Sequence, residues 1–348
     1  MNEFVNVESY INNLKNPNKL NIELLQKGAN SFFSIKCSLL NYLNDSFVND
    51  NNENLKLINI AKFIENKIKS ETKYDLKYPL KAGIAFPVGL NINNVVAHWS
   101  PNSLDTKQIL KKTDIIKIDY GIHFEGNIID SAFSYSYNDT FSDLIKISEE
   151  ATNKGCELFG EEVLINDISK EIQEIIESYE LEINNKNYDV KSVQNLCGHQ
   201  IKKYQIHGDK MIPNISMPQY TERIKNNEQY AIETYPSTGN GFAKLDYNKI
   251  NISHYMINKK NYNTHAISKL TKDETNLLNI IYKNYGTLPF SKRWLSELKI
   301  KKYCLNLNKL VEKKIIDEYP PYYEKNNSYS AQTEKNIIIY DNKKIVLT

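Results

Sequence analysis

Two aspartates in a predicted β-hairpin are the first residues of this chain that could do chemistry together. Residues 114–135 read DIIKIDYGIHFEGNIIDSAFSY, two β-branched and aromatic runs joined at Glu125-Gly126, which is typical of a hairpin. With a two-residue loop, Gly121 opposes Asp130, and Asp119 is diagonal to Asp130 on the same face. The alternative interpretation is a solvated strand face. Aspartate is depleted in strands, however, so two on one face indicate a shared role.

Five acidic or imidazole side chains stand in otherwise apolar strands or beside a glycine. They are Asp119, Asp130, His199, Glu233 and Glu334. Carboxylate oxygen with some imidazole nitrogen suits divalent metals, and two-metal sites hold their ions about 3.5–4 Å apart. Without metal, four carboxylates in a partly buried site would repel one another and become protonated. This cost favours a metal site over a structural role, but spacing alone leaves open whether the five residues converge.

Two further histidines could join such a site. His98 ends a strand-like segment before a Pro-Asn turn, where a histidine is more often a satisfied core residue than a catalyst. His207 follows His199 by eight residues, too far for one helical turn, although the two can meet across an irregular strand or loop. Gly198 before His199 permits the close backbone approach that a site needs.

The composition excludes several classes of function. The 348 residues suffice for one large domain or two ordinary ones. Lys and Arg number 44 against 42 Asp and Glu, which gives no field for nucleic acid or anionic lipid. The four cysteines lack metal-binding spacing and suit a reducing compartment. Without a signal peptide or an apolar stretch of membrane-spanning length, we expect a soluble cytoplasmic protein.

Helices and strands are expected in an order that could position these residues. Helical patterns cover residues 21–27, 31–47, 55–68, 141–158 and 165–179. Strand patterns cover residues 81–98, 114–135, 229–235 and 329–340. Residues 267–316 look like a helical insertion, with one helix beginning at Ser268 and Thr271 and a second over about 295–314. The basic C-terminal residues are expected to be a solvated end.

The motifs taken together resemble type 2 methionine aminopeptidases. The string Asp114-x-x-Lys117-x-Asp119-x-Gly121-x-His123-x-x-Gly126-x-x-x-Asp130 resembles the signature of that family. Collinear matches from about residue 75 onward include Gly83-Ile-Ala-Phe-Pro, Asn195-Leu-x-Gly198-His199, Ala231-Ile-Glu233-Thr, Arg293-Trp-Leu and Ala331-Gln-x-Glu334.

The resemblance implies a fold and a domain division. The fold is the α+β pita-bread architecture: two pseudo-symmetric halves whose antiparallel sheet encloses the metal site, with helices outside. Residues 1–348 would form a single catalytic domain, with an N-terminal helical segment over 1–75. The helical insertion at about 267–316 is the feature that separates type 2 from type 1 enzymes.

The resemblance also implies a role for each candidate residue. The ligands of two divalent ions (Co, Mn, Fe or Zn) would be Asp119, Asp130, His199, Glu233 and Glu334, with Asp130 and Glu334 bridging. Glu233 would also be the general base. His98 resembles the substrate-contacting histidine modified by fumagillin-class epoxides, and His207 the histidine over the scissile carbonyl. Phe86, His254 and Tyr319 match positions lining the pocket for the methionine side chain.

The implied activity is removal of N-terminal methionine from nascent polypeptides when the second residue is small. One alternative is an X-Pro aminopeptidase or prolidase. Those enzymes normally carry a separate N-terminal domain, and residues 1–75 are too few to form it. Another is a non-catalytic pita-bread protein that binds RNA or regulators, but such relatives have lost ligands and all five stand here. We expect a monomer without direct nucleic-acid or membrane binding, and contact with the ribosome stays open.

Three features depart from the family pattern. Cys197 stands where the family usually has Asn, which changes a hydrogen bond near His199. Pro289 replaces a small residue near the pocket wall and is expected to alter inhibitor fit. The long charged N-terminal extension of larger relatives has no counterpart here, so partner binding through it has no support.

Overall fold

A long antiparallel sheet forms the centre of the molecule. The computed structural model describes residues 20–246, 251–261, 267–300 and 303–348. Within them an eight-stranded sheet has the order β1-β3-β4-β17-β10-β8-β9, and β18 pairs with β17. These strands are β1 (Ala82–Ile92), β3 (Ile115–Phe124), β4 (Asn127–Ser136), β17 (Thr333–Tyr340), β10 (Gln229–Thr234), β8 (Cys197–Ile201), β9 (Met211–Pro213) and β18 (Lys343–Val346).

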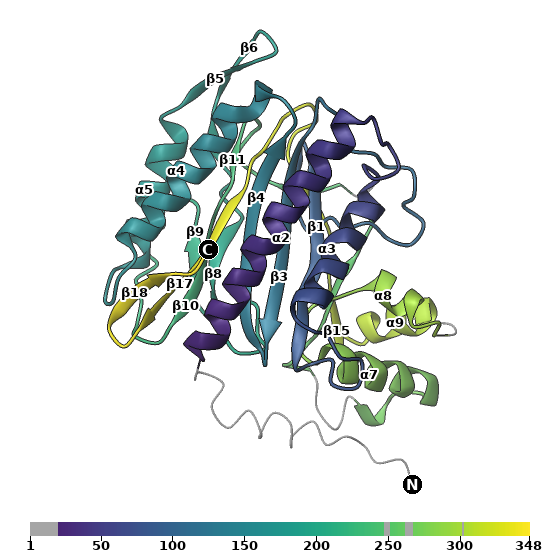
Figure 1. Ribbon diagram of the computed structural model, residues 1–348. Helices are drawn as coiled ribbons and strands as arrows, with labels where there is room; N and C mark the ends of the chain where they lie inside the picture. The colour runs from purple at the N-terminus through teal and green to yellow at the C-terminus, as the bar shows by residue number, and fades with distance from the viewer. Residues whose placement is uncertain (1–19, 247–250, 262–266, 301–302) are drawn as a thin grey trace.

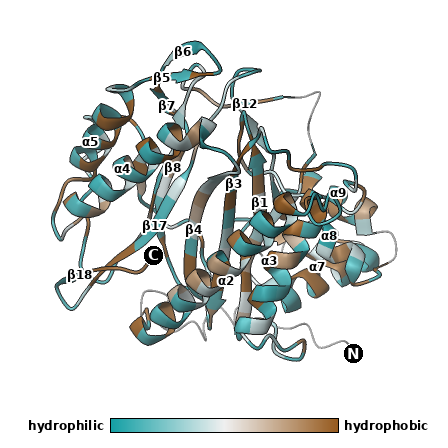
Figure 2. Ribbon diagram, turned by 45° about the horizontal axis from the view of Figure 1, so that its top comes forward, coloured by the Kyte–Doolittle hydropathy of each residue, from teal (hydrophilic) through white to brown (hydrophobic). Residues whose placement is uncertain are grey.

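Two pairs of helices cover one face of this sheet. Helices α2 (Ile22–Val48) and α3 (Leu57–Glu71) pack on β1, β3 and β4, while α4 (Ser142–Leu158) and α5 (Ile165–Glu177) pack against the part formed by β10, β17 and β9 (Figure 1). Each pair has its own apolar core. Figure 2 shows hydrophilic residues along the outer sides of α4 and α5. The opposite face of the sheet is therefore left for a site.

The sequence of each helix explains its place. Asn21 caps α2, because its side chain accepts hydrogen bonds from the backbone N–H groups of Glu23 and Leu24. In α3 the buried residues recur at helical spacing, including Ile60, Ile64 and Ile68. The predicted stripe of α5 is confirmed at Ile168, Ile172 and Ile176, whereas Ile175 is only half-buried.

The hairpin between β3 and β4 has the predicted register. Gly121 pairs with Asp130, and Asp119 pairs with Ala132. Glu125 and Gly126 both adopt positive φ, 49° and 78°. This is the backbone of a type I′ turn, whose twist matches that of the flanking strands. Both aspartates therefore point to the same face of the sheet, as expected.

In the described residues, short strands and the helices α7, α8 and α9 lie outside the central sheet. The smaller sheets contain β2 (Val95–Ala97), β16 (Tyr322–Tyr323) and β12 (Lys244–Leu245); β13 (His254–Ile257), β14 (Phe290–Ser291) and β15 (Ile316–Tyr319); β7 (Lys191–Ser192) and β11 (Pro236–Ser237); and β5 (Glu180–Ile183) and β6 (Lys186–Asp189). Helices α7 (Lys272–Tyr285), α8 (Lys292–Glu297) and α9 (Tyr303–Glu312) share an apolar core with β13, β14 and β15.

Three expectations about the C-terminal part were wrong. The helix expected over about 295–314 is divided into α8 and α9, because Lys299 takes a φ of 56°, which a right-handed helix cannot continue through. The strand expected from Tyr329 begins at Thr333. The basic C-terminal end is not a solvated tail: Lys343–Val346 pairs with β17, and Leu347 and Thr348 are buried.

The predicted single domain over residues 1–348 stays a prediction, and residues 1–19 of its N-terminal segment lie outside the described residues. Among the residues described, every helix is too short or too polar to cross a membrane.

Candidate active site

The five candidate ligands lie in two adjacent rows on one face of the central sheet. The pairings Asp119 with Ala132, Ala132 with Glu334, and Glu334 with Glu233 make one row across four strands. Asp130 precedes Ala132 by two residues, and His199 pairs with Ala231, two residues before Glu233. Because side chains alternate along a strand, all five project from the same face. The convergence that spacing left open is therefore present.

Distances within this group are short. The His199 Nε2 atom lies 3.4 Å from Asp130 Oδ2 and 3.7 Å from Glu233 Oε1. Side-chain atoms of Asp130, His199 and Glu334 lie within 4.8 Å of one another. The buried Oδ1 of Asp119 and Oε1 of Glu334 have no hydrogen-bond partner within the described ranges. Four carboxyl groups and an imidazole with unsatisfied oxygens are a donor set that fits divalent metal ions.

Burial makes this cluster electrostatically costly without a cation. Burial, followed by repulsion from Asp130, raises the pKa of both Asp119 and Glu334 well above its usual range. Burial also raises the pKa of Glu233 well above its usual range and that of Asp130 to about 7. The same burial lowers the pKa of His199 to about 4, so that its imidazole is neutral and free to bind a metal.

Two residues without a predicted role, Tyr235 and Gln332, hydrogen-bond to the carboxylates of this cluster. The Tyr235 hydroxyl donates a hydrogen bond to Glu233 Oε2. The Gln332 amide donates to the Tyr235 hydroxyl at 2.9 Å and reaches carboxylate oxygens of Glu233 and Glu334 at 3.5 Å. Tyr235 follows Glu233 by two residues and Gln332 precedes Glu334 by two. The two-residue period of a strand was therefore the signal that could have identified them.

His98 and His207 approach the cluster from loops. His98 follows β2 with a φ of 63°, and its ring centroid lies 5.9 Å from that of His254 and 6.0 Å from that of Tyr319. The ring of His207 lies edge-on to that of His199, with centroids 4.3 Å apart. The two histidines eight residues apart therefore meet, as the sequence allowed.

A cavity of about 320 Å³ opens beside the carboxylates. Its lining includes every residue that the sequence analysis assigned to the site: Phe86, His98, Asp119, Asp130, His199, His207, Glu233, His254, Tyr319 and Glu334. Cys197 and Pro289, the two departures from the family pattern, also line it.

Gly121 explains how an aromatic side chain reaches this cavity. A Cβ atom at position 121 would lie 2.1 Å from the ring of Phe86, so only glycine leaves room for that ring over the hairpin. Gly198 has a similar function, because a Cβ there would lie 2.5 Å from the carbonyl oxygen of Ala231. Both glycines thus permit close packing around the site.

Comparison with known proteins agrees with this geometry. Residues 44–258 match the model of metallopeptidase family M24. The chain is 41% identical over 294 residues to methionine aminopeptidase 2 of Debaryomyces hansenii, a match covering 84% of this chain and 68% of that protein. It is 42% identical to methionine aminopeptidase 2 of Candida dubliniensis, covering 84% of this chain and 63% of that protein.

Solved structures share the fold at low sequence identity. A thermophilic Arx1 superposes with a TM-score of 0.75 at 14% identity, covering 94% of this chain and 91% of that one. Methionine aminopeptidase from Thermotoga maritima superposes with a TM-score of 0.57 at 16% identity, covering 94% and 96%. These likenesses concern the fold alone, and they confirm the expected pita-bread architecture. On its match to the family model and its identity to curated relatives, the chain belongs to metallopeptidase family M24.

Proposed function

We propose that this protein is a methionine aminopeptidase that removes the N-terminal methionine from polypeptides whose second residue is small. The convergence of Asp119, Asp130, His199, Glu233 and Glu334 on one sheet face carries this proposal. The identity of about 40% to proteins named methionine aminopeptidase 2 supports the choice of substrate.

Two divalent ions would be held by these five side chains, three of which have ligand atoms within 4.8 Å of one another. The family resemblance implies that Asp130 and Glu334 would be shared between the ions. Such ions lower the pKa of a water molecule towards neutrality and polarise a carbonyl group. Mn, Fe, Co and Zn all accept this mixture of oxygen and nitrogen ligands.

The residues around the ions would carry the proton transfers and the orientation of the substrate. Glu233 takes a proton from the attacking water and later passes it to the leaving amine. Tyr235 fixes one Glu233 oxygen by hydrogen bonding to it. His207, facing the same space as His199, stabilises the negative charge that develops on the scissile carbonyl oxygen. His98 donates a hydrogen bond to the amide that is cleaved.

The apolar part of the cavity would bind the methionine side chain. Phe86, His254 and Tyr319 line it together with Met256. The imidazole of His254 is fixed by Ser253 Oγ at 2.9 Å and by the Pro87 carbonyl at 3.2 Å. Burial lowers the pKa of His254 to about 3, which keeps this wall uncharged for a thioether side chain.

The finer statements about partners and location belong to the same proposal. We propose a cytoplasmic location, because all four cysteines are free and free thiols suit a reducing compartment. The protein would act on nascent chains as a monomer, and it would bind neither nucleic acid nor membranes directly. Ribosome contact is not needed for it.

A peptide assay with defined metals tests this function. The purified protein is treated with a chelator, supplied with one metal at a time, and offered Met-Gly, Met-Leu and X-Pro peptides. We expect activity only after metal addition, and release of methionine from Met-Gly peptides far faster than from Met-Leu peptides. Cleavage of X-Pro peptides alone would instead identify a prolidase-type activity, and no cleavage by any metal-loaded form would favour a binding protein.

A further inference from the structure

Hydrogen bonds hold the turn that carries His207 at several points. Residues 202–210 connect β8 to β9. Strand β8 pairs with β10, the strand that carries Glu233, and β9 pairs with β8 at the edge of the sheet. The backbone of Tyr204 adopts a φ of 55° and donates a hydrogen bond of 2.8 Å to the carbonyl of Gly126. The turn is therefore attached to the hairpin that carries Asp119 and Asp130, although it belongs to the other half of the sheet.

Gln200 binds this turn directly after His207. Its side chain is buried, with 5% exposure, and points away from the face used by His199 because the two are neighbours on one strand. The Gln200 Oε1 atom accepts a hydrogen bond of 3.2 Å from the backbone N–H of Asp209, and its carbonyl accepts one of 2.5 Å from Gly208. A Cβ at Gly208 would lie 2.6 Å from Gln200 Oε1, so the turn lies directly on this amide.

A second amide fixes His207 from its other side. The Gln205 Nε2 atom donates a hydrogen bond of 2.7 Å to the carbonyl of His207 itself. Lys259 Nζ lies 3.1 Å from Gln205 Oε1 and orients that amide. The peptide groups before and after Gly208 are thus both tied to glutamine side chains.

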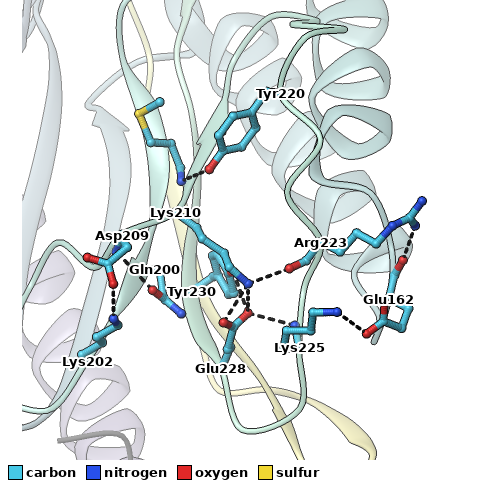
Figure 3. Close-up of polar contacts among 11 residues, drawn as sticks. Glu162, Gln200, Lys202, Asp209, Lys210, Tyr220, Arg223, Lys225, Glu228 and Tyr230 are labelled. Carbon is cyan, nitrogen blue, oxygen red and sulfur yellow. Dashed lines mark hydrogen bonds and ion pairs between the residues drawn. The ribbon is translucent and has the colours of Figure 1, made fainter.

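Charged groups close the turn at its exit. Figure 3 shows Lys202 and Gln200 reaching Asp209 from two sides. The next residue, Lys210, accepts a backbone hydrogen bond from Gln200, and its ammonium group lies 2.8 Å from Glu228 Oε1 (Figure 3). Both side chains of this ion pair are mostly buried, at 15% and 17% exposure, so it is screened less than a surface pair.

We infer that Gln200 is a positioning residue for His207. It links the strand of the proposed ligand His199 to the turn that carries the proposed oxyanion-stabilising histidine, so both imidazoles depend on one strand. The inference rests on the proposed function for the role of His207. Loss of the amide oxygen would leave the Asp209 N–H unpaired and let the turn shift. A shift of about 1 Å in a catalytic group can cost on the order of a hundredfold in rate.

The test compares Gln200→Met with two matched changes. Gln200→Met keeps an unbranched side chain of similar size and removes the acceptor, whereas Gln200→Glu keeps an acceptor. Gln173→Met removes a similar bond, 2.8 Å from the Ser216 N–H to a glutamine oxygen, on helix α5 and outside the 202–210 turn. On Met-Gly peptides we expect kcat to fall about ten- to hundredfold for Gln200→Met, with KM and bound metal nearly unchanged, and to stay near wild type for the two other variants.

Two further measurements separate positioning from a general structural effect. In a His207→Ala background, Gln200→Met should lower kcat no further, because both changes remove the same contribution. Amide hydrogen exchange at Asp209 should become faster in Gln200→Met and stay slow in Gln173→Met. Unchanged exchange at Asp209, or additive losses with His207→Ala, would overturn the inference. The exchange result decides it even if the wild-type protein cleaves no methionyl peptide, an outcome that would refute the proposed function instead.

Discussion

Asp119 offers the most direct test of the proposed metal centre. It is half-buried at the end of the row of acidic residues, with Oδ1 unpaired among the residues described. Asp119→Asn keeps the size of the side chain but removes the charge, so we expect metal content to fall and activity to drop by roughly a hundredfold or more. Changes to residues that only support ligands already cost about 10- to 100-fold.

Elemental analysis of the purified variant, together with peptide turnover, checks this prediction. Asp143→Asn, an exposed aspartate in the first turn of α4, is the control and should bind metal normally. The folded state of Asp119→Asn should persist, since removing one buried charge lessens repulsion. Near-wild-type turnover in Asp119→Asn would mean that this residue is not a ligand.

His98 combines an unusual backbone with a proposed contact to substrate. Its φ of 63° lies in the left-handed region, where a β-carbon is disfavoured and Asn is tolerated better than most residues. His98→Asn should therefore keep the turn while removing the imidazole. We expect a loss of kcat/KM of at least about tenfold on Met-Gly peptides, comparable to the removal of an acid–base or polarising group.

The thermal midpoint of His98→Asn serves as its own control. We expect it to match the wild type within a few degrees, whereas His98→Val should lower it because a β-branched residue resists positive φ. If His98→Asn turns over peptides at the wild-type rate, the histidine has only a structural role, which was the alternative interpretation of its position in the sequence.

The predictability of individual site residues followed their local geometry. Asp119 and Asp130 could be placed together because a two-residue hairpin loop determines their register. His199, Glu233 and Glu334 lie on strands distant in sequence, so periodicity could assign their faces but not their proximity. Tyr235 and Gln332 received no role: the two-residue period places them on the face of Glu233 and Glu334, but nothing local shows that they hydrogen-bond to those carboxylates.

At the scale of elements, one buried ion pair joins the C-terminal helices to the N-terminal ones. Glu65 on α3 accepts hydrogen bonds from Arg293 on α8 at 2.6 and 2.9 Å and from the Trp294 indole at 2.9 Å. The Glu65 and Arg293 side chains are only 3% and 2% exposed. The match at Arg293-Trp-Leu was visible in the sequence, but its partner lies more than two hundred residues away and was not.

Removing one partner of this pair should be costly. Glu65→Leu leaves the Arg293 guanidinium buried without its main counter-ion, and such changes typically destabilise by about 3–5 kcal/mol. Urea unfolding monitored by circular dichroism would measure this loss. The double variant Glu65→Leu/Arg293→Met removes both charges and should be markedly more stable than the single variant, so equal losses in the two would contradict this account.

The sequence predicts some helices and strands better than others. The helices and the β3–β4 hairpin carry strong periodic or turn signals, whereas the break between α8 and α9 depends on Lys299, a residue without any intrinsic preference for positive φ. Strand β18 forms a tight hairpin with β17, joined at Asp341 and Asn342, which both take positive φ. Beyond it, the Thr348 hydroxyl accepts a 2.8 Å hydrogen bond from the Asn336 N–H.

At the scale of the whole molecule, the site joins the two helix-covered parts of the sheet. Strands β4 and β17 meet at the pairing of Ala132 with Glu334, between Asp119 on one side and Glu233 on the other. The acidic residues of both halves therefore face one another across this junction. Without cations, repulsion among these carboxylates destabilises the junction between the two parts of the sheet. Bound ions would attract the same carboxylates and stabilise the junction.

This arrangement predicts that metal stabilises the fold, and more so as the pH rises. The folded-state pKa of Asp130 is raised to about 7, against about 3.9 in an unfolded chain. Between these two values the metal-free folded state holds a proton that the unfolded state has released, so its stability falls as the pH increases through this range. Metal binding displaces such protons and should restore the lost stability.

Thermal unfolding of chelated and metal-loaded protein at pH 5 and pH 7.5 tests this linkage. We expect the metal-dependent rise in Tm to be small at pH 5 and several degrees larger at pH 7.5. Asp130→Asn should weaken the pH dependence of the chelated form, because the replaced side chain no longer titrates. Calorimetric titration in buffers of different ionisation enthalpy should also detect proton release on metal binding near pH 6. A Tm that ignores metal at both pH values would mean that these carboxylates do not form the cation site that their geometry and burial indicate.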